Sequence, residues 1–175
     1  MTLLDPAPAT SRPTSLLEEP RAFRDGLSSM VTSVCVITTA VDGQRFGFTA
    51  NSVTSVSMDP PLILVCLADT AECHDAFLAT DCVAVNVLAE DQAHLSTVFA
   101  TRGADKFAAA PFHDGLTGAP VLADATLTLE GRVHERTTAG DHTMVLVEVT
   151  AVARGERTPL TYQGRQFRRL LTTEE

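Results

Sequence analysis

The sequence predicts a mainly β protein, an antiparallel barrel with a few flanking α-helices. Apolar, β-branched runs of strand length recur along the chain, whereas only three segments carry helical spacing. Two long segments, 127–133 and 144–152, alternate apolar and polar residues, as antiparallel strands with one buried face do. Because many strands and few helices must bury their apolar faces against one another, we expect an antiparallel barrel with helical additions.

The N-terminal region divides into two parts. Residues 1–19 are rich in Pro, Thr and Ser and predict a flexible arm ahead of a single domain over 20–172. Pro20 suits the first turn of a helix. The apolar residues after it lie at helical spacing and predict an amphipathic helix: Phe23, Leu27, Met30 and Val31.

A β-hairpin is expected next. Residues 34–38 alternate in character, Asp42-Gly43 is a typical hairpin turn, and 46–50 begins the return strand. The remaining elements before the two long strands are predicted as strands over 62–67 and 82–88, helices over 72–79 and 91–101, and an irregular loop over 102–120.

Composition limits the classes of function. The 175 residues, 45% of them hydrophobic, are enough for one domain with a real core. The net charge of −9 disfavours nucleic acid as a partner. No signal peptide and no run of about 20 apolar residues is recognisable, so we expect a soluble cytoplasmic protein with no membrane association.

The cysteines and histidines suggest no metal centre. The four cysteines form no Cys-x-x-Cys pair and predict free thiols in a reducing compartment. Four histidines lack the spacing of a metal site, and we interpret them as structural or surface residues: His74, His94, His113 and His134.

The most informative segment is 47–61, which reads GFTANSVTSVSMDPP. It places six hydroxyl or amide side chains among small residues, just before an apolar strand. Short donors and closely approaching backbone N–H groups suit a polar, planar, phosphorylated ligand such as a flavin. A polar strand face turned to solvent explains the same pattern equally well. Neither a Gly-x-Gly-x-x-Gly motif nor a P-loop is present, so a nucleotide must bind in another way.

Short motifs in a fixed order resemble the short-chain flavin reductases over about residues 21–170. Each is weak alone, but together they are specific. The motifs are Thr49-Ala50-Asn51-Ser52, Ser55-Val56-Ser57, Asp59-Pro60-Pro61, Asp105-Lys106-Phe107, Gly118-Ala119-Pro120, Gly140-Asp141-His142, and Pro159-Leu160-Thr161-Tyr162 followed by Gly164.

This resemblance implies an FMN-binding split barrel, usually a homodimer. It also implies an NAD(P)H:flavin oxidoreductase that passes a hydride from nicotinamide C4 to flavin N5. The reduced FAD or FMN is then released, typically to a separate flavin-dependent monooxygenase. Proximity and stacking would supply the catalysis. A non-catalytic FMN-binding module is the alternative, and an FMN oxidase of the pyridoxamine phosphate type is a more distant one.

The resemblance also assigns site residues. Flavin contacts are expected from Thr49, Ala50, Asn51, Ser52, Ser55, Val56, Ser57, Cys66, Leu67, Ser96, Phe99, Lys106 and Phe107. Contacts to the nicotinamide nucleotide are expected from Asp141, His142 and Phe167, with His142 as the catalytic residue. Core packing for Cys66, a solvated surface position for Lys106 and a plain hairpin turn at Gly140-Asp141 are the competing interpretations.

The choice of cofactor is only partly determined by the sequence. FAD and FMN share the isoalloxazine and ribityl parts that an open groove would bind, so both remain open. NADH is mildly favoured over NADPH, because no arginine cluster is clearly placed for a 2′-phosphate.

Overall fold

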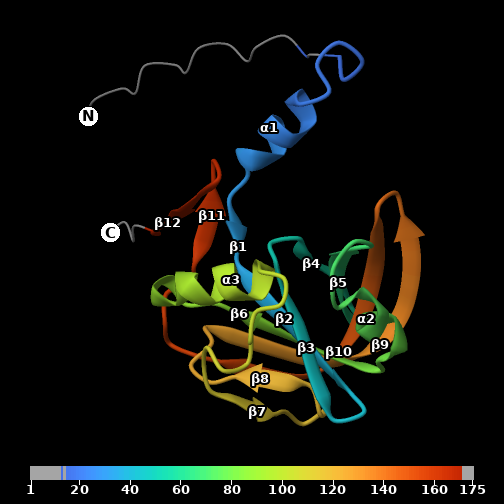
Figure 1. Ribbon diagram of the computed structural model, residues 1–175, viewed down its shortest axis with the longest axis vertical. Helices are drawn as coiled ribbons and strands as arrows, with labels where there is room; N and C mark the ends of the chain where they lie inside the picture. Colours follow the sequence, from blue (N-terminus) through green and yellow to red (C-terminus); the bar gives the residue numbers. More distant parts are fainter. Residues whose placement is uncertain (1–12, 14, 171–175) are drawn as a thin grey trace.

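One seven-stranded antiparallel sheet forms the body of the protein in the computed structural model, which describes residue 13 and residues 15–170 (Figure 1). From edge to edge its strands are β3 (Gln44–Ala50), β2 (Cys35–Val41), β6 (Cys82–Val87), β9 (Leu127–Ala139), β10 (His142–Arg154), β5 (Pro61–Ala68) and β4 (Val53–Met58). The mainly β antiparallel architecture expected from the sequence is confirmed.

Residues with positive φ form the turns of two hairpins in the large sheet. Asp42 and Gly43 both have positive φ, at 50° and 77°, and connect β2 to β3 as the Asp-Gly sequence predicts. Gly140, with φ 66°, begins the turn between β9 and β10, so that His142 is the first residue of β10 and pairs with Ala139. Both long strands were therefore predicted correctly, although each runs for 13 residues.

Two of the helices lie against the large sheet, and two small sheets complete the fold. The helices are α1 (Ala22–Ser28), α2 (His74–Ala79), the 3₁₀ turn η1 (Glu90–Gln92) and α3 (Ala93–Ala100). One small sheet joins β1 (Thr32–Ser33), β11 (Thr161–Gln163) and β12 (Gln166–Arg168), and the other joins β7 (Phe112–Asp114) and β8 (Pro120–Leu122). Part of the loop expected to be irregular over 102–120 is thus a short strand.

Two apolar clusters hold these layers together. The larger one lies within the curved sheet and includes Val65, Val85 and Val145, with Phe77 of α2 buried against it. The smaller one packs α3 onto the sheet through Leu95 and other buried side chains. Because α2 and α3 are anchored in these clusters, they fix the position of the loops between them.

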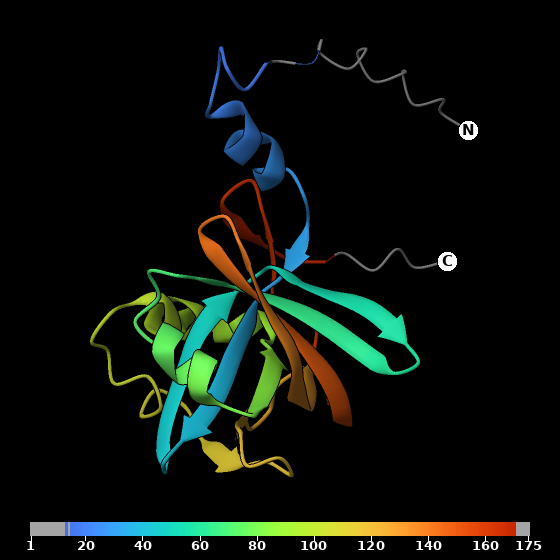
Figure 2. The ribbon, with the colours of Figure 1, turned by 90° about the vertical axis from the view of Figure 1, so that its right-hand side faces the viewer.

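Helix α1 differs from the sequence expectation in one respect. It forms where predicted, but none of its residues is buried, and Figures 1 and 2 show it standing away from the sheet. Its apolar side chains therefore have no core to pack on within residues 15–170. The arm expected at 1–19 lies largely outside the described residues.

The polar segment 47–61 is not one continuous strand. Strand β3 ends at Ala50, Asn51 and Ser52 turn the chain, and β4 then runs along the sheet edge, paired with β5. The Asp59-Pro60 peptide, which is cis, lies in the turn of the β4–β5 hairpin that projects from the sheet in Figure 2. In the described part of the chain, no helix is long and apolar enough to span a membrane.

Candidate active site

A cavity of about 380 Å³ opens where β3 and β5 end and β10 begins. Ala68, the last residue of β5, pairs with His142, the first residue of β10, so strand register alone places this imidazole at the cavity. The C-terminal end of α3 supplies Phe99 and Ala100 to the lining. Of the residues predicted to bind cofactor, the cavity collects Thr49, Ala50, Asn51, Ser52, Cys66, Leu67, Phe99, Lys106 and His142.

Two neighbouring cavities contain three further predicted residues. Phe107 lines a cavity of about 360 Å³ that shares Glu72, Cys73 and Lys106 with the first one. Ser96 and Phe167 line a cavity of about 350 Å³ on the other side. This third cavity shares Thr49 and Asn51 with the first. These predicted residues therefore line three adjoining cavities rather than a single enclosed pocket.

Four predicted residues line none of these three cavities. Ser55, Val56 and Ser57 lie on β4, and Val56 is 53% exposed. The turn at Asn51 and Ser52 directs β4 away along the sheet edge, which the uninterrupted polar pattern of the sequence does not reveal. Asp141 is also outside the lining, but it contacts His142 directly.

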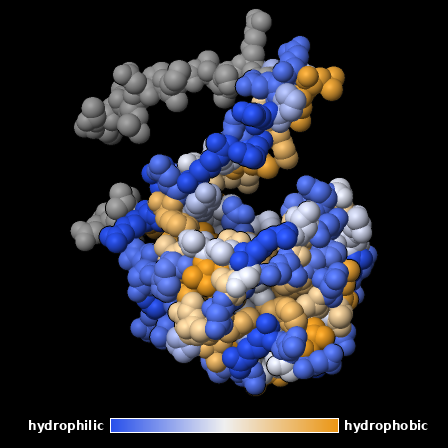
Figure 3. Space-filling view, viewed as in Figure 1, coloured by the Kyte–Doolittle hydropathy of each residue, from blue (hydrophilic) through white to orange (hydrophobic). Residues whose placement is uncertain are grey.

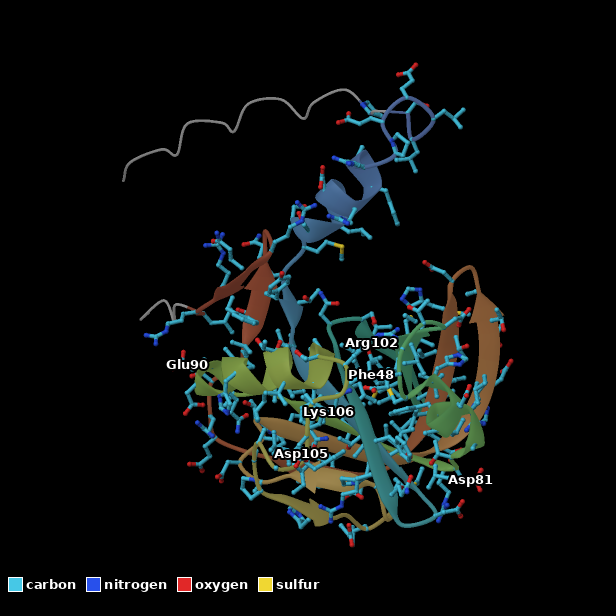
Figure 4. The ribbon with its side chains drawn as sticks, in the orientation of Figure 1. Phe48, Asp81, Glu90, Arg102, Asp105 and Lys106 are labelled. Carbon is cyan, nitrogen blue, oxygen red and sulfur yellow. The ribbon has the colours of Figure 1, made fainter. Side chains whose placement is uncertain are left out.

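The positive charge of the cavity lies in the loop after α3. Lys106 is not a solvated surface lysine, because its side chain is only 12% exposed. Its Nζ donates a hydrogen bond to the carbonyl oxygen of Gly47, at 3.3 Å, and lies 3.5 Å from a carboxylate oxygen of Glu72. The Arg102 guanidinium donates to the carbonyl oxygen of Thr70. Figure 4 shows Phe48, Arg102 and Lys106 grouped beside α3.

Glu72 connects the two loops that border this end of the cavity. Both of its carboxylate oxygens accept from the backbone N–H of Gly103, at 3.2 Å each. This hydrogen bond lowers the pKa of Glu72, and the nearby charges of Lys106 and Arg102 act in the same direction. Cys73, the next residue, is 5% exposed, and burial raises the pKa of its thiol.

The His142 imidazole has a defined orientation. Its Nδ1 lies 2.7 Å from Oδ1 of Asp141, which, as a carboxylate, accepts the Nδ1 proton. The hydrogen bond from His142 lowers the pKa of Asp141, so the acceptor stays ionised at neutral pH. The tautomer that follows from this contact carries its proton on Nδ1 and leaves Nε2 as the nitrogen for a ligand.

A network of hydrogen bonds holds the β9–β10 turn beside His142. Nε2 of His74 lies 3.1 Å from Oγ1 of Thr143, and this hydroxyl donates to Asp69 at 3.2 Å. The backbone N–H of Asp69 in turn donates to the carbonyl oxygen of Asp141 at 3.0 Å. His74, interpreted from the sequence as structural or surface, is therefore tied to the site through Thr143.

Sequence reasoning missed the loop residues of the cavity, including Thr70, Glu72, Cys73 and Arg102. None of them belongs to a motif, and they meet only because α2 and α3 bring two loops together. The available signal was weak: Arg102 lies four positions before the chain's single lysine, in an otherwise acidic protein.

The lining fits a planar, partly polar anion. Apolar contact comes from Phe48, Leu67 and Phe99, and hydrogen-bonding side chains come from the turn after β3. Cations lie at one end, and the volume is within the usual range for small-molecule sites, about 300–1,000 Å³. A phosphorylated flavin ring has this combination of properties.

The flavin reductase like domain model matches residues 27–171. The chain belongs to this family. It is 41% identical over 153 residues to the NADH:riboflavin 5′-phosphate oxidoreductase of Streptomyces pristinaespiralis, which covers 85% of this chain and 86% of the relative. It is 37% identical to the reductase component of a 4-nitrophenol monooxygenase from Rhodococcus opacus, over 83% of this chain and 78% of the relative.

The fold also matches solved structures of the family. An NADH:FAD oxidoreductase of Streptomyces globisporus, in complex with NAD and FAD fragments, superposes with a TM-score of 0.87 at 32% identity, over 94% of this chain and 100% of that one. Two Rhizobium meliloti relatives are longer, and the chain spans 43% and 58% of their lengths. The comparisons confirm the expected family, fold and enzyme class, an oxidoreductase that reduces flavin.

Proposed function

We propose that this protein reduces diffusible FAD or FMN with NADH in the cavity beside His142. The observation that carries the proposal is that one cavity collects the polar turn after β3, the cation Lys106 and the His142 imidazole. Bound flavin supplies an N5 position that accepts the hydride of nicotinamide C4 and so carries two electrons away. The protein's task is to bind and align the two rings, which is the main source of rate in such a transfer.

Each part of the cavity has a role in that alignment. Thr49, Asn51 and Ser52, with neighbouring backbone groups, would hydrogen-bond the flavin ring and ribityl chain. Lys106 would hold the phosphate, because it is the ammonium group at the cavity wall. His142, fixed by Asp141, would position the nicotinamide nucleotide through Nε2. No general acid or base is required for the hydride transfer itself.

NADH is the proposed electron donor, because the flavin-reducing relatives described above are named as NADH oxidoreductases. The 2′-phosphate that distinguishes NADPH lies on the adenosine ribose, away from the nicotinamide that His142 would position. Both FAD and FMN are proposed as substrates, since the flavin relatives above are named for each.

A homodimer is the proposed assembly, with α1 as part of the interface. An isolated helix shorter than about 12–15 residues is marginal in water, so the seven residues of α1 need a packing partner. Phe23, Leu27, Met30 and Val31 are 48–59% exposed, and Figure 3 shows hydrophobic side chains on this protruding segment. We propose that a second copy of the chain covers these side chains. Residues 20–172 would act as a single domain in each copy.

The dimer is tested by light scattering. We expect the wild type to have twice the mass of one chain and Phe23→Asp combined with Leu27→Asp to shift toward one chain. A wild type that stays monomeric at assay concentrations would refute the dimer without affecting the chemistry.

A separate flavin-dependent monooxygenase is the proposed consumer of the reduced flavin. The Rhodococcus opacus relative is named as the reductase component of such a system. We place the reaction in the cytoplasm, where the four free thiols of this chain are the expected state.

Steady-state NADH oxidation tests the central activity. We expect slow oxidation without added flavin and a rate that rises and saturates with FMN, FAD or riboflavin in excess over protein. A protein that binds flavin stoichiometrically but oxidises no NADH would instead support the alternative of a non-catalytic binding module.

A further inference from the structure

We propose that Glu72 is a built-in competitor for the flavin phosphate. Its carboxylate occupies the anion-binding end of the cavity, and a phosphorylated flavin must displace it or share its partners. This inference rests on the proposed function, because it concerns the affinity of the same cavity for its flavin.

The partners of Glu72 are those that a phosphate would use. The Gly103 N–H donates to both carboxylate oxygens, at 3.2 Å each, and Lys106 Nζ lies 3.5 Å from one of them. Arg102 precedes Gly103 and lines the same cavity. A backbone N–H and an ammonium group that converge on one anion, with a guanidinium group in the lining of the same cavity, have the chemistry of a phosphate receptor.

The carboxylate can leave this receptor more easily than the cation can. The Lys106 side chain is 12% exposed and is also held by the Gly47 carbonyl oxygen, whereas the Glu72 side chain is 49% exposed. A mostly buried ammonium without an anion is costly, so Glu72 stabilises Lys106 while no ligand is bound. An incoming phosphate can take over that role, and Glu72 can turn toward solvent.

Competition from Glu72 lowers the affinity of the cavity for phosphorylated flavin. Part of the phosphate's interaction energy is offset by the loss of the Glu72 contacts and by repulsion between the two anions. Riboflavin, which has no phosphate, does not compete with Glu72. Lower affinity for FMN suits an enzyme that must release reduced flavin rather than retain it.

The test compares FMN with riboflavin in Glu72→Gln. Binding can be followed by the change in flavin fluorescence on excitation of the isoalloxazine ring. We expect the Kd for FMN to fall by about tenfold, the effect of one unit charge near contact distance in a partly solvated site, with the Kd for riboflavin unchanged. The matched control is Asp105→Asn, which removes the same charge from an exposed residue of the loop that carries Lys106. It should change both constants little.

Three results would overturn the inference. The first is an unchanged ratio of the two constants in Glu72→Gln. The second is a similar gain in Asp105→Asn, which would indicate only a general charge effect. The third is loss of the folded state or of riboflavin binding in Glu72→Gln, which would make Glu72 a structural tie. A wild-type protein that binds neither FMN nor riboflavin would contradict the proposed function and, with it, this inference.

Discussion

Replacement of Gly47 by alanine should damage both stability and flavin binding. A Cβ at this buried position would lie 2.8 Å from a ring carbon of Phe99 and 2.9 Å from the Ile37 carbonyl oxygen. Ordinary contacts between carbon atoms are about 3.5–4.0 Å, so the shortfall at Phe99 is about 1 Å. The Ile37 oxygen belongs to the paired strand β2, so relief of both contacts requires a shift of the Phe99 ring and of the local strand pairing. Overpacking of this kind costs about 1–3 kcal/mol.

Thermal unfolding and flavin titration together measure the effect of Gly47→Ala. In a protein of this size about 1 kcal/mol corresponds to a Tm change of about 2–4 °C, so we expect a fall of roughly 2–12 °C. Flavin affinity should fall as well, because Phe99 lines the cavity and the Gly47 carbonyl oxygen accepts from Lys106. Gly26→Ala is the matched control, since a Cβ there would meet nothing within 4 Å. An unaltered Tm and unaltered flavin binding in Gly47→Ala would refute this reasoning.

Three further predictions concern the site and the core. His142→Ala should raise the Michaelis constant for NADH far more than that for flavin. Equal effects on the two constants would contradict a role of His142 in binding the nicotinamide nucleotide. Thr143→Val, which breaks the links to His74 and Asp69, should act in the same direction but more weakly, and an effect on flavin alone would contradict it. Burial raises the pKa of Cys35 from 9.0 to about 12, so its contribution to stability is complete below pH 9.0 and declines as pH rises toward about 12. The Cys35 thiol should therefore resist alkylation in the native protein at neutral pH, and rapid labelling there would contradict the stated burial.

Local signals in the sequence were sufficient for most of the fold. Asp42-Gly43 and Gly140-Asp141 specify hairpin turns because few residues tolerate positive φ, and these turns define the β2–β3 and β9–β10 pairs. The alternation over 144–152 then specifies which face of β10 is buried. The apolar spacing of α1 predicted a helix correctly, but periodicity alone does not identify the surface that covers its apolar face.

The residues that line the cavity were predictable mainly where motifs lie next to a strand end. Thr49 through Ser52 and His142 are such positions, and the cavity contains them. Ser55 through Ser57 carry the same chemistry, yet a single turn takes them away along the edge strand β4. The contact of Glu72 with Gly103 joins residues 31 positions apart in two loops, so no periodicity or spacing could reveal it.

A crystal structure with flavin and NAD⁺ bound tests the central claim most directly. The proposal predicts the isoalloxazine ring against the turn after β3, its phosphate end toward Lys106, and the nicotinamide between the ring and His142. Flavin bound instead around Tyr162 and Phe167, with the cavity beside His142 filled by side chains, would contradict it.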